Sequence, residues 1–334
     1  MVSLQVAQEI EIKLSVAPDH ARRLWDVLAT HPHVKPASRR VFSAYYDTPD
    51  WHLQSGGVVL RLRRDRKRWM QTVTSAGIAA GGLHRRAEHE TVVPAQLPSF
   101  PALIEAGAGK LLAGRPTREA LQVMFTTEFR RSSTLLRPRA GTIVEVRLDR
   151  GAIAAGERRD PICEIEIELK SGEITALFDL AFEIIRALPV RLDNRSTAQR
   201  GYALAARIEP APVKASTPPL SADMSVEDAF AAVALHCLAH LQDNEIGLLA
   251  GRDPEYLHQA RVALRRLRSA FRVFDAAMPG LRSARILDEL KPVGRLLGEA
   301  RDVDVFALET LPRAGCAQQA GVAALRRRAQ NARR

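Results

Sequence analysis

Two stretches of the sequence alternate charged and branched apolar residues in the same way, and this alternation limits the folds that the chain can adopt. In QEIEIKL, residues 8–14, apolar side chains fall on one face of an extended segment and charged side chains on the other. The charged face carries Glu9, Glu11 and Lys13. EIEIELK, residues 164–170, repeats the pattern with Glu164, Glu166 and Glu168. Both segments are predicted to be β-strands with one buried face.

A charged strand face usually meets water, but neighbouring carboxylates on one face repel each other unless cations lie opposite. Three further predicted strands supply such cations together with more acids. They contribute Arg61 and Arg63, then Arg86, Glu88 and Glu90, then Glu145, Arg147 and Asp149. An open sheet could solvate all these faces, and a closed barrel could instead turn them inward to make a polar tunnel.

A polar tunnel of this composition would suit a polyanion that is bound together with a divalent metal. Carboxylate oxygens are the ligands that Mg²⁺ prefers, and guanidinium groups bind phosphate oxygens in pairs. The alternation alone does not decide between the solvated sheet and the tunnel.

Several motifs resemble the CYTH family, the triphosphate tunnel metalloenzymes. They are ExExK at residues 9–13, YYDT at 45–48, LRLR at 60–63 and the EIEIELK strand. FTTEFRR at 125–131, EVRLDRG at 145–151 and STAQRGYAL at 196–204 are most similar to the bacterial inorganic triphosphatase branch. The resemblance runs over about residues 5–208 and implies an α+β protein whose first domain is an eight-stranded antiparallel β-barrel.

The resemblance also implies roles for individual residues in the hydrolysis of inorganic triphosphate with Mg²⁺ or Mn²⁺. The metal ligands would be Glu9, Glu11, Glu145, Asp149, Glu164, Glu166 and Glu168. The triphosphate would be held by Lys13, Arg61, Arg63, Arg86 and Arg131. The general base stays unassigned.

The chain departs from the family pattern at Thr74 and Thr197, where this branch usually has lysines. These departures keep a second hypothesis open, a catalytically weak polyphosphate-binding protein. Thiamine triphosphatase and class IV adenylate cyclase-like activities are further alternatives, although no nucleoside-binding feature stands out.

The composition agrees with an anionic ligand, because the 334-residue chain has a formal net charge of +11. Its three cysteines, Cys163, Cys237 and Cys316, are scattered and are expected to be free thiols in a reducing compartment. No stretch is long and apolar enough to span a membrane, and no signal-peptide pattern begins the chain. We therefore expect a cytoplasmic protein with no specific nucleic-acid partner.

The proline-rich stretch at residues 209–221 separates two predicted domains, at 1–208 and 222–334. Beyond it the period of the apolar residues becomes helical. Ser225 is expected to cap one helix and Asp253 the next. We predict that this second domain is an all-α, antiparallel helical bundle.

One predicted helix carries a basic stripe, defined as His258, Arg261, Arg265, Arg268 and Arg272. Their 3-4-3-4 spacing places them on one helix face, and residues 259–274 contain no acid to pair with them. This segment and LGEARDVDV at residues 297–305 resemble the CHAD domain, a module associated with inorganic polyphosphate. Such a domain usually has two similar helical halves, and the resemblance covers the first, so we expect either a shortened module or a longer chain.

Overall fold

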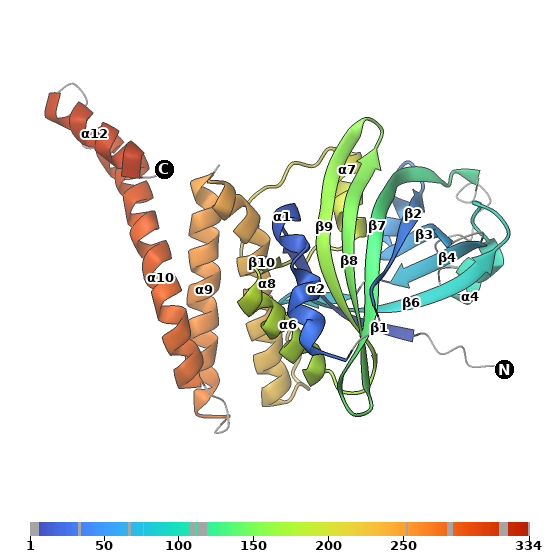
Figure 1. Ribbon diagram of the computed structural model, residues 1–334. Coiled ribbons are helices and arrows are strands. Elements are labelled where there is room, and N and C mark those ends of the chain that lie inside the picture. Colours follow the sequence, from blue (N-terminus) through green and yellow to red (C-terminus); the bar gives the residue numbers. More distant parts are fainter. Residues whose placement is uncertain are drawn as a thin grey trace. The chain divides into compact units, whose positions relative to one another are not determined.

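The computed structural model describes residues 7–32, 35–65, 68–75, 77–106, 108, 111, 119–251, 253–278, 283–313 and 320–332. The chain divides into two compact units, Met1–Glu209 and Pro210–Arg334 (Figure 1). We call them the barrel unit and the helical unit. No helix within the described ranges is both long and apolar enough to cross a membrane.

The barrel unit is built on one antiparallel sheet (Figure 1). Eight of its strands are β1 (Ala7–Val16), β2 (Ala37–Asp47), β3 (Val58–Asp65), β4 (Arg68–Ser75), β6 (Leu83–Val93), β7 (Gln122–Arg139), β8 (Thr142–Ala155) and β9 (Arg158–Ser171). They follow the order β1-β9-β8-β7-β2-β3-β4-β6, and β6 pairs again with β1. That last pairing closes the sheet, so the prediction of an eight-stranded antiparallel barrel is confirmed.

Two short strands extend the sheet beyond the closed barrel. They are β5 (Ile78–Ala80), which pairs with β6, and β10 (Val190–Leu192), which pairs with the end of β1. The other elements of this unit are α1 (Pro18–Ala21), α2 (Leu24–Val27), η1 (Leu28–Thr30), α3 (His52–Ser55), α4 (Phe100–Glu105), α6 (Thr175–Ala187) and α7 (Thr197–Ala206).

The apolar faces of the strands point out of the barrel and are covered by helices. Ile12 of β1 and Ile167 of β9 pack in one buried cluster with Leu177 and Ile184 of α6. A second cluster joins the outer faces of β3 and β4 to Leu103 of α4. Because successive side chains of a strand alternate between its two faces, the charged residues between these apolar residues must point inward. The repeated glutamates therefore face the barrel interior.

The aspartate of the YYDT motif anchors α7, whereas Tyr45 of the same motif lines the cavity of the barrel. The fully buried Asp47 carboxylate accepts hydrogen bonds from the backbone N–H groups of Thr48, Leu53 and Gln54, and so organises the turn into α3. It also accepts a 3.1 Å hydrogen bond from the Tyr202 hydroxyl of α7. This bond ties α7 to the strand β2.

The helical unit contains α8 (Val226–Ala250), α9 (Pro254–Asp275), α10 (Ser283–Val305), the π-helical turn η3 (Phe306–Thr310), α11 (Leu311–Arg313) and α12 (Ala320–Ala332). Ser225 caps α8 and Asp253 caps α9, as predicted. Helix α9 packs against both α8 and α10, which agrees with a helical bundle.

The proline-rich segment adopts no helix or strand, and its first part is bound to the helical unit. The carbonyl oxygen of Val213 accepts hydrogen bonds from His240 Nε2 at 2.9 Å and from the Asn244 amide at 3.0 Å. Arg266 donates to the carbonyl oxygen of Ser216 at 2.7 Å. His240 therefore has a structural role, because it fixes the position of the linker.

Candidate active site in the barrel

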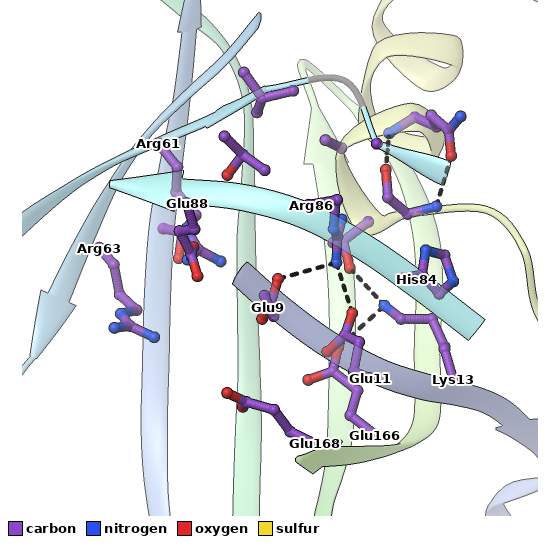
Figure 2. A pocket seen from close by; sticks show the side chains of 18 of the residues that line it. Glu9, Glu11, Lys13, Arg61, Arg63, His84, Arg86, Glu88, Glu166 and Glu168 are labelled. Carbon is purple, nitrogen blue, oxygen red and sulfur yellow. Dashed lines mark hydrogen bonds and ion pairs between the residues drawn. The ribbon is translucent and has the colours of Figure 1, made fainter. Parts of the chain in front are cut away.

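A polar cavity of about 540 Å³ occupies the barrel unit. Eight acidic and eight basic side chains line it among the described residues, so its formal charge is close to zero. The acidic ones are Glu9, Glu11, Glu88, Glu90, Glu145, Asp149, Glu166 and Glu168, and the basic ones are Lys13, Arg39, Arg61, Arg63, Arg86, Arg131, Arg147 and Lys170. Figure 2 shows how β1 and β6 bring several of these side chains toward one another.

Lys13 lies at the centre of the charged residues of the cavity, and only 1 % of its surface is exposed. Its Nζ lies 3.1 Å from Glu164 Oε1 and 3.0 Å from Glu166 Oε1. It also donates to the Thr197 hydroxyl at 3.2 Å. Burial disfavours the charged ammonium, but these carboxylates outweigh burial and raise the pKa of Lys13 above its usual value.

Arg131 of β7 joins two acids from neighbouring strands. Its guanidinium holds Asp149 of β8 through two hydrogen bonds, Nε–Oδ1 at 2.9 Å and Nη2–Oδ2 at 2.5 Å. The same Nη2 donates to Glu166 Oε2 of β9 at 2.9 Å. This bidentate geometry is typical of strong arginine–carboxylate pairs.

Asp149, Glu164 and Glu166 form a buried acidic cluster. One carboxylate oxygen from each residue can be chosen so that all three lie within 4.8 Å of one another. The strand register explains this, because Asp149 is the cross-strand partner of Glu164 in the β8–β9 ladder. Carboxylate oxygens gathered in this way are the kind of ligand that a divalent cation such as Mg²⁺ or Mn²⁺ would require.

The remaining predicted site residues form ion pairs around the cavity. Arg86 Nη2 lies 2.6 Å from Glu11 and 3.4 Å from Glu9 (Figure 2). Further along β6, Glu88 pairs with Arg61 at 3.1 Å and Glu90 with Arg63 at 2.9 Å. Arg147 pairs with Glu145 at 2.8 Å and also with Glu168.

The acids of the cavity differ in how readily they ionise. Burial, together with the charges of Glu166 and Glu9, raises the pKa of Glu11 to about 8 despite its ion pair with Arg86. Burial also raises the pKa of Asp149, to about 6. Burial acts on Glu166 in the same sense, but Lys13, Arg131 and Arg147 together hold the pKa of Glu166 well below its usual value. At neutral pH the cavity therefore contains both firmly ionised carboxylates and at least one that retains a proton.

The barrel brings the twelve predicted metal and triphosphate residues together. Eleven of them line the cavity, and Glu164 lies buried beside Lys13. Both departures from the family pattern, Thr74 and Thr197, also line the cavity. These two positions, where the family resemblance predicts lysines, therefore contribute no positive charge to this site.

Some cavity residues were not among the predicted site residues. The sequence pattern placed Arg147, Glu88 and Glu90 on charged strand faces but did not assign them to the site. Each lies an even number of residues from a predicted site residue on its own strand and so shares that residue's face. His84 of β6 lies in the cavity wall, and its Nε2 bonds to the carbonyl oxygen of Asp193 at 2.9 Å. Burial lowers the pKa of His84 to about 4, so it is neutral at pH 7. The sequence signal for His84 was its even spacing with Arg86 and Glu88.

Helix α9 carries the five residues of the basic stripe in the helical unit. Arg265 and Arg272 are exposed, whereas His258, Arg261 and Arg268 are partly buried. The same helix supplies the buried core residues Ala263, Leu264, Leu267 and Phe271. The stripe thus follows the predicted helix face.

Together the closed barrel and its cavity define a β-barrel protein with a charged interior. The CYTH domain profile matches residues 7–202, which is more than half of the sequence, and the chain belongs to the CYTH family. The CHAD domain profile matches residues 232–334, so the helical unit contains a partial CHAD domain.

The chain is also similar to individual known proteins. The chain is 32 % identical to an inorganic triphosphatase of Haemophilus influenzae over 201 residues, which cover 60 % of this chain and 56 % of the relative. It therefore spans about half the length of that curated relative. A solved structure of a candidate adenylyl cyclase from Hippeastrum is 20 % identical, covers 58 % of this chain and 95 % of its own, and has a TM-score of 0.41. The CHAD domain of Ricinus communis is 41 % identical over 37 % of this chain and 41 % of its own, with a TM-score of 0.33.

Proposed function

We propose that the barrel unit hydrolyses inorganic triphosphate in a reaction that depends on Mg²⁺ or Mn²⁺, and that the helical unit binds inorganic polyphosphate. The observation that carries the first part is one cavity lined by six of the seven candidate metal-binding acids and by all five candidate phosphate-binding cations, with Glu164 buried beside Lys13. The similarity to an inorganic triphosphatase supports the same reaction.

The charge balance of the cavity supports the need for a divalent metal. The lining groups are formally neutral as a set, so a multiply charged triphosphate would bring uncompensated negative charge into a partly enclosed site. A divalent ion held by Asp149, Glu164 and Glu166 would offset that charge and, when bound, polarise phosphoryl oxygens as a Lewis acid. Glu9, Glu11, Glu145 and Glu168 complete the proposed ligand set.

The cations of the cavity would change partners when the ligands bind. Lys13 and Arg131 form ion pairs with the buried acids. If these acids held a metal ion, the two cations would be available for phosphate oxygens, and Arg61, Arg63 and Arg86 would add further contacts. Preorganised positive charge of this kind stabilises the charge that develops on the transferred phosphoryl group.

The test is phosphate release from triphosphate, thiamine triphosphate, ATP and long-chain polyphosphate, each with Mg²⁺, with Mn²⁺ and with EDTA. We expect metal-dependent release, fastest from inorganic triphosphate. Glu166→Gln should abolish it, because this carboxylate joins the acidic cluster to three of the cavity cations. Release that persists in EDTA, or full activity in Glu166→Gln, would contradict the metal role.

A second candidate function is polyphosphate capture without efficient turnover. It is favoured by the position of Thr74 and Thr197 in the cavity wall, since each lacks an amine that could contact phosphate or transfer a proton. Tight triphosphate binding with negligible phosphate release under every metal condition would select this candidate over the hydrolase.

The basic stripe supports polyphosphate binding by the helical unit. Residues 259–274 of α9 contain no acid, so a polyanion would relieve the mutual repulsion of the arginines. Binding should weaken steeply as salt rises, because surface charges are screened. We expect the double substitution of Arg265 and Arg268 by glutamate to abolish polyphosphate retention and to leave triphosphate hydrolysis unchanged. Salt-insensitive retention by this variant would remove the stripe from the binding site.

A further inference from the structure

Two glycines of α10 face the ends of arginine side chains of α9. Gly294 and Gly298 are four residues apart and so share one face of their helix. A Cβ atom at position 298 would lie 2.8 Å from Arg261 Nη1, and a Cβ atom at position 294 would lie 3.1 Å from Arg268 Nη1. A side chain at either glycine would therefore require the end of the facing arginine side chain to move.

Glycine in the interior of a helix is unfavourable relative to alanine, so two glycines on one face of α10 call for a packing reason. The contact with the guanidinium groups supplies that reason. Gly321 of α12 offers a contrast within the same unit, because a Cβ atom there would have no other atom within 4 Å.

Neither guanidinium has a carboxylate partner among the residues that the structure describes. Arg261 and Arg268 are partly buried, and Arg268 Nε is buried without a hydrogen-bond partner. Leu264 and Leu297, which lie between them along the two helices, belong to the apolar core of the unit. Two cations held beside an apolar core without a counter-charge favour an anion as their partner.

The spacing of the two arginines indicates the length of that anion. Seven residues separate them along α9, which corresponds to about 10 Å along the helix axis. A linear polyanion can reach both guanidinium groups at once, and each planar group can bind two phosphate oxygens.

We propose that Gly294 and Gly298 are specificity-determining positions that seat Arg268 and Arg261 in an anion-binding crease at the contact of α9 and α10, and that the crease takes two separated phosphate groups of one linear polyphosphate chain. The proposal rests on the proposed polyphosphate binding of the helical unit. It adds that α10 contributes to binding because two of its residues are glycines. It also assigns the phosphate contacts to the partly buried Arg261 and Arg268, in contrast to the exposed Arg265 and Arg272.

The experiment measures the affinity of the full chain for long-chain polyphosphate at fixed salt, together with the thermal midpoint. Gly298→Ala should weaken binding about tenfold, because its methyl group must displace the Arg261 guanidinium. Gly294→Ala should weaken binding less, since its contact distance is longer. Alanine favours a helix, so neither midpoint should fall. Gly321→Ala, the matched control, should leave the affinity unchanged.

A double-mutant cycle separates a seating role from a general change of structure. If Gly298 acts through Arg261, then Gly298→Ala should have no effect in an Arg261→Ala background. Additive losses would overturn the seating role. The cycle also remains informative if one of the glycine variants is less stable than the parent.

The binding measurements distinguish a failure of polyphosphate binding from a failure of the crease. No binding by the unaltered chain would overturn polyphosphate binding itself, and the crease with it. Binding by the unaltered chain that Gly298→Ala does not weaken would overturn the crease alone. Equal displacement of bound polyphosphate by single-stranded DNA of matched charge would show that the crease does not select phosphate chains.

Discussion

Replacement of Glu11 by glutamine should stabilise the metal-free protein while it abolishes metal-dependent turnover. Glu11 is buried beside two other acids, Glu9 and Glu166, and burial together with these charges raises its pKa to about 8. The neutral amide resembles the protonated carboxyl group in shape. The variant therefore avoids the unfavourable ionisation and also lacks a candidate metal ligand.

The magnitude follows from the change of pKa on folding. The unfolded chain releases this proton near pH 4.5 and the folded chain near pH 8. A raised pKa means that the contribution of Glu11 to stability is intact below pH 4.5 and is lost as the pH rises to about 8. The loss is roughly 3 kcal/mol at pH 7 and roughly 5 kcal/mol above pH 8, since each pH unit is worth about 1.4 kcal/mol. These are upper limits for the gain in Glu11→Gln, because Arg86 loses a charged partner.

The assay is urea unfolding in EDTA at several pH values from 5 to 9, followed by the same series with Mg²⁺. The gain of the variant over the parent should grow with pH in EDTA. Mg²⁺ should stabilise the parent more than the variant, because only the parent offers an ionisable Glu11. Glu145→Gln is the matched control, and its effect on the free energy of unfolding should have the opposite sign. Despite partial burial, the hydrogen bonds and charges of Arg147 and Lys170 lower the pKa of Glu145 to about 2, so its removal should destabilise the protein at neutral pH.

Parallel changes with pH in the free energies of unfolding of the parent and of Glu11→Gln would refute this reasoning. If the difference between Glu11→Gln and the parent stays constant from pH 5 to 9, the Glu11 carboxyl group ionises with an ordinary pKa. The electrostatic account of the cavity would then be wrong.

Three other substitutions test the remaining interactions. Lys13→Met should lower the free energy of unfolding by about 3–5 kcal/mol in urea at pH 7, because it leaves the buried carboxylates of Glu164 and Glu166 without this cation. A change below about 1 kcal/mol would contradict this. Lysine at both Thr74 and Thr197 should tighten triphosphate binding at least about tenfold in calorimetry, because one charge-assisted contact is worth about 1.5–3 kcal/mol; unchanged affinity would show that these positions do not reach the ligand. Tyr202→Phe should lower stability by about 1 kcal/mol in thermal unfolding through loss of its hydrogen bond to Asp47; an unaltered midpoint would mean that the bond does not hold α7.

The sequence alone determined which residues share a strand face and which share a helix face. Side chains alternate strictly along an extended chain, so Glu9, Glu11 and Lys13 had to lie together, and the same argument placed Glu164, Glu166 and Glu168. The helix caps at Ser225 and Asp253 were equally local, because a cap involves only neighbours a few residues away.

The alternation by itself could not decide which way the charged faces pointed. A solvated sheet and a closed barrel share the same period of two, and only the pairing of β1 with β6 distinguishes them. That pairing was expected from family resemblance rather than from the pattern. It depends on apolar cover from elements distant in the sequence, such as α6 over β1.

The tertiary structure alone decided which charges neutralise one another. Lys13 meets Glu164 and Thr197, which lie 151 and 184 residues further along the chain. The seating of Arg261 on Gly298 likewise depends on how α9 packs against α10. Covalent neighbours fix the face on which a side chain lies, because backbone geometry repeats at every residue. The partner of that side chain is fixed by strand register and helix packing, which bring distant parts of the chain within a few ångströms.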